Sequence, residues 1–125
     1  MKILLDTHIL LWWLMNDPSL ATGTRLLIEN PKNTIFVSAI SAWEIAIKRA
    51  IGKLQAPDDF DKAIERSHFH SLPITIPHAM GIMFLPPHHH DPFDRMLISQ
   101  SKIEGCTLLT RDGRIGKYDL PIIWA

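Results

Sequence analysis

Short apolar runs alternate along the chain with longer segments in which apolar residues recur every three or four positions. A run of about four to eight apolar residues is typical of a buried strand, whereas the longer period predicts a helix with one face in the core. The predicted strands are Lys2–Leu5, Thr34–Val37, Leu72–Ile76, Thr107–Thr110 and Pro121–Trp124. The predicted helices are Thr7–Met15, Ser19–Glu29, Ile40–Ala50, Asp58–His70, Pro77–Leu85 and Pro92–Glu104.

This alternation of strands and helices contains no hairpin signal and is typical of a parallel sheet flanked by helices. Pro73 interrupts one predicted strand and cannot donate a ladder hydrogen bond, which places that strand at an edge of the sheet. With 125 residues the chain is long enough for one buried core. We therefore expect a single α/β domain over residues 1–125, without repeats or an interdomain linker.

Four acidic residues stand where apolar runs give way to a helix or a turn. They are Asp6, Glu44, Asp94 and Asp112. In a parallel α/β sheet such junctions gather at one edge, outside the carboxyl ends of the strands. Carboxylates that crowd together repel one another unless a cation holds them. The arrangement therefore points to a divalent metal.

Each of these carboxylates also has a purely structural explanation. Asp6 would cap the first helix, and Asp112 would form a turn with the glycine that follows it. Ser41 and Glu44 have the spacing of a capping box, in which the glutamate reaches back to the serine amide. Taken singly, each acid fits such a local role, and only their convergence at one edge favours a metal site.

Asp91 is a fifth acid close to the last of these positions. It precedes Pro92, which suits the first position of a helix, so Asp91 is a natural N-cap. Asp94 would then be a favourable first-turn acid of the same helix. We assign Asp91 to capping alone and leave it out of the candidate site.

Three or four converging carboxylates offer the oxygen ligands that hard cations prefer. Because no Cys/His pair has zinc spacing, we expect Mg²⁺ or Mn²⁺. Phosphodiester hydrolysis by two metals uses such carboxylates to hold ions roughly 3.5–4 Å apart. A general-base histidine is not required, because a metal-bound water is already acidified.

Four motifs in this order and spacing resemble those of a known family. The motifs are Leu4-Leu5-Asp6-Thr7-His8, Val37-Ser38-Ala39-Ile40-Ser41-Ala42-Trp43-Glu44-Ile45, Asp91-Pro92-Phe93-Asp94-Arg95-Met96-Leu97-Ile98 and Leu109-Thr110-Arg111-Asp112. The chain resembles, nearly end to end, the PIN-domain ribonucleases and specifically the VapC-type toxins of bacterial toxin–antitoxin pairs. The resemblance implies a three-layer PIN-like fold with a short parallel sheet flanked by helices.

The resemblance also implies roles for particular residues. Its catalytic and metal-binding quartet would be Asp6, Glu44, Asp94 and Asp112. Asp6 and Asp94 would ligate the main ion, Glu44 would share it or orient the attacking water, and Asp112 would serve a second ion or act through water. Thr7 and Thr110 match polar positions that steady the site by hydrogen bonding, whereas His8 receives no role.

The activity that the resemblance implies is Mg²⁺- or Mn²⁺-dependent hydrolysis of RNA phosphodiester bonds. It further implies a homodimer and a cognate VapB-like antitoxin that blocks the site. Thirteen basic and thirteen acidic residues leave no net charge, so RNA must be held by a local patch. Arg95 and Arg111, each beside a proposed ligand, are the candidate phosphate contacts, the alternative being an ordinary structural role.

Other features set limits on this interpretation. No segment reaches the roughly 18 apolar residues needed to span a bilayer. The single cysteine, Cys106, cannot form an internal disulfide and fits a core thiol, so we expect a reducing cytoplasm. His88-His89-His90 cannot easily aim three rings at one ion from a loop, and we expect these histidines to be exposed beside the site.

The four tryptophans are expected mainly in the core, at Trp12, Trp13, Trp43 and Trp124. The helix that carries the first two has more apolar surface than one core face needs. One of that pair is therefore free to line a groove for an antitoxin segment or a second subunit, with burial inside the domain as the alternative.

Two other functions are compatible with acids above a parallel sheet. One is a non-catalytic PIN-like module that holds RNA or a partner without cutting, which a missing acid would favour. The other is a metal-dependent phosphatase or a phospho-acceptor domain. Phosphatases of that kind usually place Asp-x-Asp after the first strand, and here Asp6-Thr7-His8 lacks the second acid.

Overall fold

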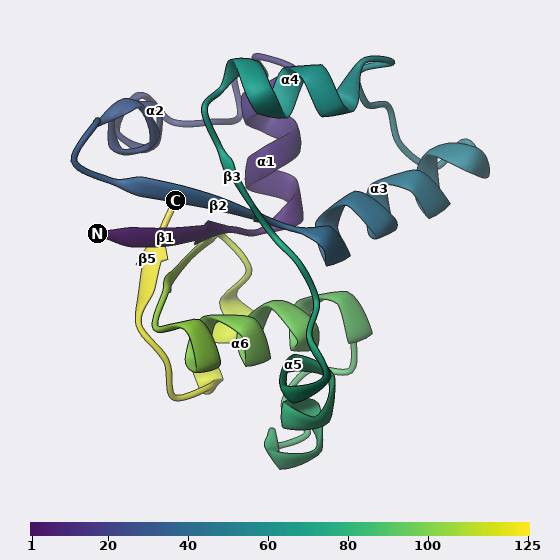
Figure 1. Cartoon of the computed structure of the whole chain (residues 1–125), viewed down its shortest axis with the longest axis vertical. Coiled ribbons are helices and arrows are strands. Elements are labelled where there is room, and N and C mark those ends of the chain that lie inside the picture. The colour runs from purple at the N-terminus through teal and green to yellow at the C-terminus, as the bar shows by residue number, and fades with distance from the viewer.

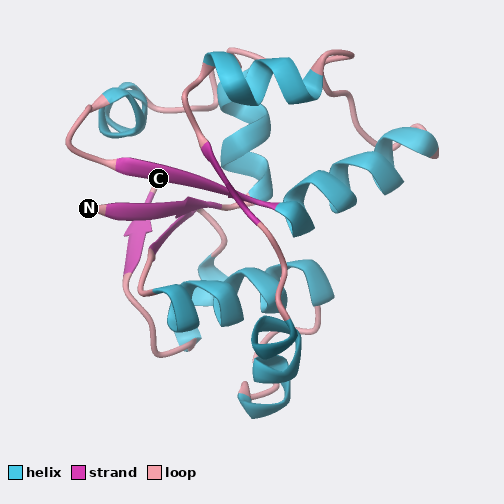
Figure 2. Ribbon diagram, viewed as in Figure 1, coloured by secondary structure: helices cyan, strands magenta, loops and turns pink.

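Five parallel strands form one sheet in the order β3-β2-β1-β4-β5. The computed structural model describes all of residues 1–125, and Figure 2 shows the strands at the centre of the molecule with helices on both sides. The strands are β1 (Lys2–Leu5), β2 (Thr34–Ser38), β3 (His70–Leu72), β4 (Thr107–Thr110) and β5 (Ile122–Trp124).

The helices are α1 (Thr7–Leu14), α2 (Thr22–Glu29), α3 (Ala39–Ala50), α4 (Phe60–Arg66), α5 (Ile76–Gly81) and α6 (Pro92–Glu104), with short 3₁₀ turns η1 (Ile82–Phe84) and η2 (Gly113–Lys117). Helices α1, α2 and α4 lie on one side of the sheet and α5 and α6 on the other, while α3 runs outward from the end of β2 (Figure 1). This is the three-layer parallel α/β fold that the sequence predicts. No helix has both the length and the apolar character needed to cross a membrane.

The core consists of two apolar clusters, one on each face of the sheet. Successive residues of β1 alternate between them, because side chains of a strand point to opposite faces. Ile3 and Leu5 pack with α1 and α2, whereas Leu4 packs with the apolar side of α6. All three are fully buried, which explains why the central strand reads as a continuous apolar run.

The edge strand β3 differs from its predicted position. It covers His70–Leu72 and pairs with β2 so that Ser38 lies opposite Leu72. Pro73, which the prediction placed inside the strand, lies just beyond its end because it has no N–H for the ladder. The helix predicted up to His70 ends at Arg66. Ser67 and His68 form a turn after it, in which His68 has a φ of 60°.

The start of α3 also differs, and this bears on the site. The helix begins at Ala39, and the Ser38 hydroxyl accepts a hydrogen bond of 3.0 Å from the Ile40 amide as its N-cap. Ser41 therefore lies inside the helix, and its proposed capping box with Glu44 is wrong. The carboxylate of Glu44 is thereby released from a capping role.

Candidate metal centre

Asp6 follows β1 directly and performs two tasks with its two carboxylate oxygens. Oδ1 caps α1 by accepting hydrogen bonds from the amides of His8 (2.8 Å) and Ile9 (3.2 Å). Oδ2 accepts a hydrogen bond of 2.6 Å from the hydroxyl of Thr110 at the end of β4. The pairing of β1 with β4 explains this contact, because Leu5 lies opposite Leu109 in the sheet. Asp6 is thus a helix cap that is also buried above the sheet edge.

Asp94 lies in the first turn of α6, next to the cap formed by Asp91. The Asp91 carboxylate accepts hydrogen bonds from the amides of Phe93 (2.8 Å) and Asp94 (3.2 Å), which confirms its assignment as an N-cap. The Asp94 carboxylate is therefore not used for capping. Its Oδ2 lies 2.7 Å from Nε2 of His89 instead.

His89 is a member of the site that the sequence interpretation missed. Its side chain is 4% exposed, and Nε2 lies between Asp94 (2.7 Å) and Oδ2 of Asp112 (3.5 Å). The expectation of an exposed histidine loop holds for His88 and His90 but is wrong for His89. The short connection from Pro87 to Pro92 keeps all three histidines near the start of α6, where Asp94 lies, but nothing in the sequence singles out His89.

Asp112 follows β4 and is tied to its own turn. Its Oδ1 accepts hydrogen bonds from the amide and Nε of Arg114 (3.0 and 3.1 Å), and Oδ2 accepts one from Nη2 (3.0 Å). These hydrogen bonds, with Arg114 beside the carboxylate, hold the pKa of Asp112 below its ordinary value. The turn role considered for Asp112 is therefore present, and its carboxylate still faces His89.

Glu44 lies in the middle of α3 and is almost fully buried. One carboxylate oxygen, Oε2, is 2.6 Å from Nζ of Lys48 one turn along the helix. The other, Oε1, is buried and has no hydrogen-bond partner. A buried carboxylate oxygen without a partner is costly, so its presence needs an explanation outside the protein chain.

The structure brings Asp94 and Asp112 close together, places Asp6 beside them, and leaves Glu44 farther to one side. Donor atoms of His89, Asp94 and Asp112 lie within 4.8 Å of one another. Asp6 joins this group through the Thr110 hydroxyl, which also accepts a hydrogen bond of 3.1 Å from the Asp112 amide. Glu44 lies to one side, on a helix packed against α6. Its connection runs through Lys48, whose raised pKa reflects Glu44 first and then the charges of Asp91 and Asp94.

The electrostatics of Asp94 favour a cation at this position. Burial first, and then the negative charge of Asp91, raise the pKa of Asp94 from 3.8 to about 6. The charge of Asp6 acts in the same direction, while the hydrogen bond from His89 opposes it. Carboxylates held together against such repulsion are characteristic of sites that bind a metal or act on a substrate.

The other residues predicted to support the site or to contact RNA are Thr7, Arg95 and Arg111, and each contacts other parts of the protein. The Thr7 hydroxyl donates to Ser41 Oγ at 2.9 Å, inside the protein. Arg95 donates to backbone carbonyls of the preceding loop and to the Tyr118 hydroxyl, so its guanidinium is engaged within the protein. Arg111 stacks over Trp12, with 4.6 Å from Cζ to the ring centroid. Its side chain borders a hollow of about 250 Å³ that Asp6 and Asp112 also line.

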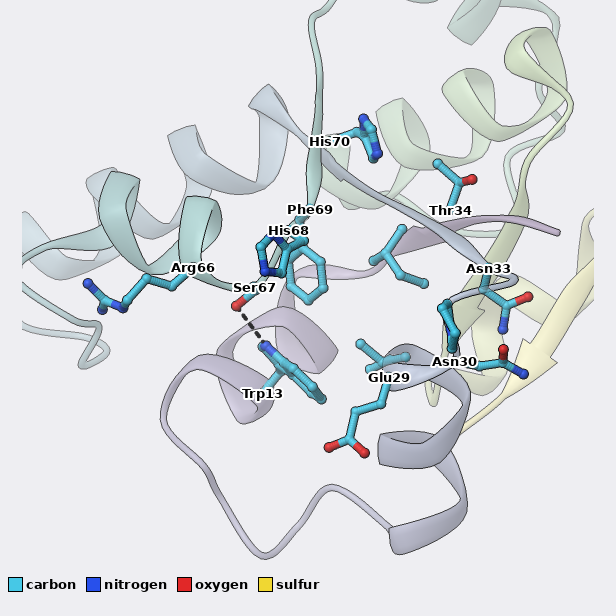
Figure 3. A pocket seen from close by; sticks show the side chains of 13 residues that line it. Trp13, Glu29, Asn30, Asn33, Thr34, Arg66, Ser67, His68, Phe69 and His70 are labelled. Atoms are coloured by element: carbon cyan, nitrogen blue, oxygen red, sulfur yellow. Dashed lines mark hydrogen bonds between the residues drawn. The ribbon is translucent and has the colours of Figure 1, made fainter.

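A larger cavity lies at the other end of the sheet. It has a volume of about 650 Å³ and is bordered by Thr34 and His70, the first residues of β2 and β3. Figure 3 shows Trp13 and Phe69 within it, with the indole N–H of Trp13 donating to Ser67 Oγ at 3.0 Å. The cavity contains none of the four proposed ligands. Trp13 therefore lines a hollow as well as the core, in keeping with the groove considered from the sequence.

Two tryptophans depart from the expected core location. Trp43 is 59% exposed and Trp124 is 53% exposed. Trp43 contacts the edge of Phe93 with ring centroids 5.7 Å apart, and Trp124 lies against Gly116. Both rings are therefore partly covered by neighbouring elements at the surface.

The donor set fits a divalent cation. The converging donors are carboxylate oxygens of Asp94 and Asp112 with one imidazole nitrogen, and Glu44 on the neighbouring helix α3 adds a buried carboxylate oxygen that no group of the protein satisfies. The sequence interpretation gave the main ion to Asp6 and Asp94, whereas the carboxylates that the structure brings closest together are those of Asp94 and Asp112. These two would hold the ion, with Asp6 and Glu44 beside them.

Comparisons with known proteins identify the family of the chain. The family model described as PIN domain matches residues 3–120. Ribonuclease VapC22 of Mycobacterium tuberculosis (strain ATCC 25618 / H37Rv) is 26% identical over 122 residues, which cover 95% of this chain and 93% of that protein. Ribonuclease VapC16 of the same organism is 49% identical over 35 residues, which span 28% of this chain and only 25% of that protein.

Solved structures share the fold at lower identity. The crystal structure of VapBC2 from Rickettsia felis bound to a DNA fragment from its promoter matches with a TM-score of 0.72 at 18% identity, covering 98% of each chain. FitAcB from Neisseria gonorrhoeae matches with a TM-score of 0.63 at 22% identity, covering 97% of this chain and 96% of that chain.

Proposed function

The chain belongs to the PIN domain family, and on that premise we propose that it is a metal-dependent endoribonuclease, the toxin of a toxin–antitoxin pair. The observation that carries the proposal is the buried acidic edge, where Glu44 Oε1 lacks a partner and the pKa of Asp94 is raised. The names of VapC16 and VapC22 supply the substrate class, since both are ribonucleases. Residues 1–125 act as one PIN domain.

Mg²⁺ or Mn²⁺ bound at this edge would acidify a water molecule and neutralise charge on the phosphate. The chain's own residues prepare the site for such an ion. Thr110 fixes the Asp6 carboxylate, and the α6 cap formed by Asp91 leaves Asp94 free to face the site. Glu44 Oε1 is available to accept a proton or a hydrogen bond from water, because nothing in the protein occupies it. Asp112 holds its position through Arg114.

The RNA backbone needs cations beside this acidic edge. Arg111 borders the hollow that Asp6 lines and is exposed. Its Nε and Nη2 donate to the carbonyls of Ala125 (3.3 Å) and Ser19 (2.8 Å), which hold the guanidinium in place, and it is the residue we assign to a phosphate contact. Arg95, also considered from the sequence, has its donors directed to carbonyls of residues 82–89, so we assign it to holding that loop. The stacking of Arg111 on Trp12 would keep its guanidinium at the rim of the site.

The partners we propose are a VapB-like antitoxin and a second copy of the chain. Structurally similar proteins from Rickettsia felis and Salmonella typhimurium were crystallised as VapBC with DNA. A second copy fits the apolar surface of α5 and η1, where four large side chains are more than half exposed: Ile76, Met80, Met83 and Phe84. Large apolar side chains exposed this close together in the sequence are typical of an interface. An intracellular RNA substrate and the buried free thiol of Cys106 suit a cytoplasmic protein.

The direct test is incubation with a structured RNA and, separately, with a small phosphate monoester. Each substrate is offered with EDTA, Mg²⁺ or Mn²⁺. We expect internal cleavage of the RNA only with metal, and no release of phosphate from the ester. RNA binding without cleavage in any metal would contradict the proposal and favour a non-catalytic RNA-binding module, and ester hydrolysis alone would favour a phosphatase.

A further inference from the structure

His89 presents a ring nitrogen to two of the proposed metal ligands. Nε2 lies 2.7 Å from Asp94 Oδ2 and 3.5 Å from Asp112 Oδ2. Two ligand atoms that each lie about 2.1 Å from one ion are about 3 Å apart when they meet it at a right angle. The two observed distances bracket that separation, so one ion can be reached by the imidazole and both carboxylates with small adjustments. The ion would replace the hydrogen bond between Nε2 and Asp94, leaving a neutral imidazole with its proton on Nδ1.

The backbone of His89 is clamped, so that its ring is fixed before any ligand arrives. Its amide donates to the Tyr118 hydroxyl at 2.9 Å, and its carbonyl accepts from Arg95 Nη1 at 3.2 Å. Arg95 also donates to the Tyr118 hydroxyl at 3.1 Å, which joins the two contacts into one unit. The loop is thereby held from both α6 and the segment after η2. Such support is what a preorganised ligand requires.

A separate observation points to a missing cation at this edge. Glu44 Oε1, on the helix packed against α6, is buried without any hydrogen-bond partner. A histidine that served only to satisfy Asp94 would leave this carboxylate oxygen unexplained. Helix α3 packs against α6, and the charge of Lys48 responds to Glu44 and to Asp94, so the two carboxylates share one electrostatic environment in which a cation would be stabilised.

We propose that His89 Nε2 is itself a ligand of the metal centre, together with Asp94 and Asp112. The inference rests on the metal centre of the proposed function and adds a nitrogen ligand to its carboxylates. Imidazole favours transition-metal dications over Mg²⁺, which prefers oxygen ligands. The centre therefore selects a transition-metal dication, for which Mn²⁺ is the probe, in preference to Mg²⁺.

The test measures metal binding by the full chain in the absence of RNA. Pulsed electron paramagnetic resonance of bound Mn²⁺ detects coupling to a ligand ¹⁴N, and ¹⁵N-histidine labelling assigns it to an imidazole. We expect this coupling in the wild type and in His90→Ala, the matched control, since His90 is the exposed neighbour of His89. The coupling should disappear in His89→Ala and in His89→Gln, a variant that retains a polar side chain.

Calorimetric titration supplies the second measurement. In His89→Gln we expect Mn²⁺ affinity to fall about tenfold or more, while Mg²⁺ affinity changes by less than about threefold. The wild-type spectrum keeps the proposal testable if both His89 variants fail to fold. Absence of nitrogen coupling in wild type, its persistence in His89→Gln, or an equal loss of both metals would overturn the inference.

These results separate the inference from the proposed function. RNA cleavage without nitrogen coupling would overturn only the role of His89. Nitrogen coupling without any RNA cleavage would support the ligand and overturn only the ribonuclease assignment.

Discussion

The two ends of the sheet differ in how many of their polar side chains have hydrogen-bond partners within the protein. At the amino ends of β2 and β3, the cavity of about 650 Å³ is lined by side chains with internal partners, such as Trp13 with Ser67 and Asn33 with the Leu27 carbonyl. At the carboxyl ends of β1 and β4, the hollow beside Asp6 and Asp112 is only about 250 Å³, and a second cavity of about 630 Å³ lies by the carboxyl ends of β2 and β3. Near this edge Glu44 Oε1 has no hydrogen-bond partner, and the pKa of Asp94 is raised.

If the metal binds at the acidic edge, as we propose, cavity size is a poor guide to chemistry in this molecule. A default search would take the larger pocket as the active site. Buried carboxylates that the fold leaves incompletely satisfied are the stronger indicator, because they lower the stability of the metal-free protein and are explained by a ligand. If the acidic edge is the site of catalysis, substitutions there change activity, and substitutions at the amino ends of the strands change stability.

The largest expected effect is on catalysis at the acidic edge. Asp6→Asn should reduce metal-dependent RNA cleavage by about a thousandfold or more, since loss of one charged ligand removes several kcal/mol of stabilisation from the transition state. Asparagine also caps helices, so α1 and the fold should be retained. Cleavage rates and far-ultraviolet circular dichroism check both parts, and full activity in a folded variant would contradict the account.

At the opposite end, the effect should fall on stability instead. Trp13→Ala should lower the free energy of unfolding by about 3 kcal/mol, because it removes a large ring packed against Phe69 and a hydrogen bond to Ser67. RNA cleavage per folded molecule should be unchanged. Urea denaturation and cleavage at a temperature where the variant is folded provide the measurements, with the more exposed Trp124→Ala as the milder control. A specific loss of cleavage would place catalysis near the cavity.

Asp94→Asn should stabilise the metal-free protein while reducing cleavage. The folded pKa of Asp94 is about 6, above the ordinary 3.8. Its ionisation therefore costs no folding free energy below pH 4, and the cost grows as the pH rises to 6 and is fully present above it. A shift of this size corresponds to about 3 kcal/mol at pH 7.5.

Urea denaturation of the Asp94→Asn variant and the wild type with EDTA checks this pH dependence. The stability difference should be present at pH 7.5, vanish near pH 4, and shrink when Mn²⁺ stabilises the wild type alone. A difference that is equal at both pH values would show that burial of the Asp94 charge is not its cause.

The smallest effect is expected at the rim of the larger cavity. Arg66 forms an exposed ion pair of 3.0 Å with Asp59, and such pairs contribute about 0–1 kcal/mol. Arg66→Ala should therefore change stability by less than about 1 kcal/mol and leave cleavage intact. A substantial loss of RNA cleavage, measured against wild type at equal concentration, would mean that RNA reaches this end of the sheet.

The sequence was informative about the fold where the pattern was local. β1 and β4 carry strong apolar runs and α6 has Asp91 and Gly105 as its end signals, and these elements occur where predicted. The position of β3 depended on its pairing with β2, a long-range contact that the apolar pattern around Pro73 does not encode. The start of α3 was set by Ser38 and not by the equally plausible Ser41.

The candidate site was predictable only in part for the same reason. The acids could be proposed because junctions in a parallel sheet converge at one edge. Burial of His89 depends on a clamp by Arg95 and Tyr118, residues that lie 6 and 29 positions away. Nothing in three consecutive histidines distinguishes the middle one until that clamp is seen. The same hydrogen bonds explain why Arg95, although it follows Asp94 in the sequence, points toward the loop that carries His89 and not toward a phosphate.

The central claim is that the carboxyl edge of the sheet, and not the larger cavity, binds the catalytic metal. Anomalous diffraction from crystals soaked in Mn²⁺ tests it most directly, because it locates the ion without reference to activity. The account predicts an anomalous peak within bonding distance of Asp94 and Asp112, near Asp6. A peak confined to the cavity beside Trp13, or no peak in a protein that still cleaves RNA only with Mn²⁺, would contradict it.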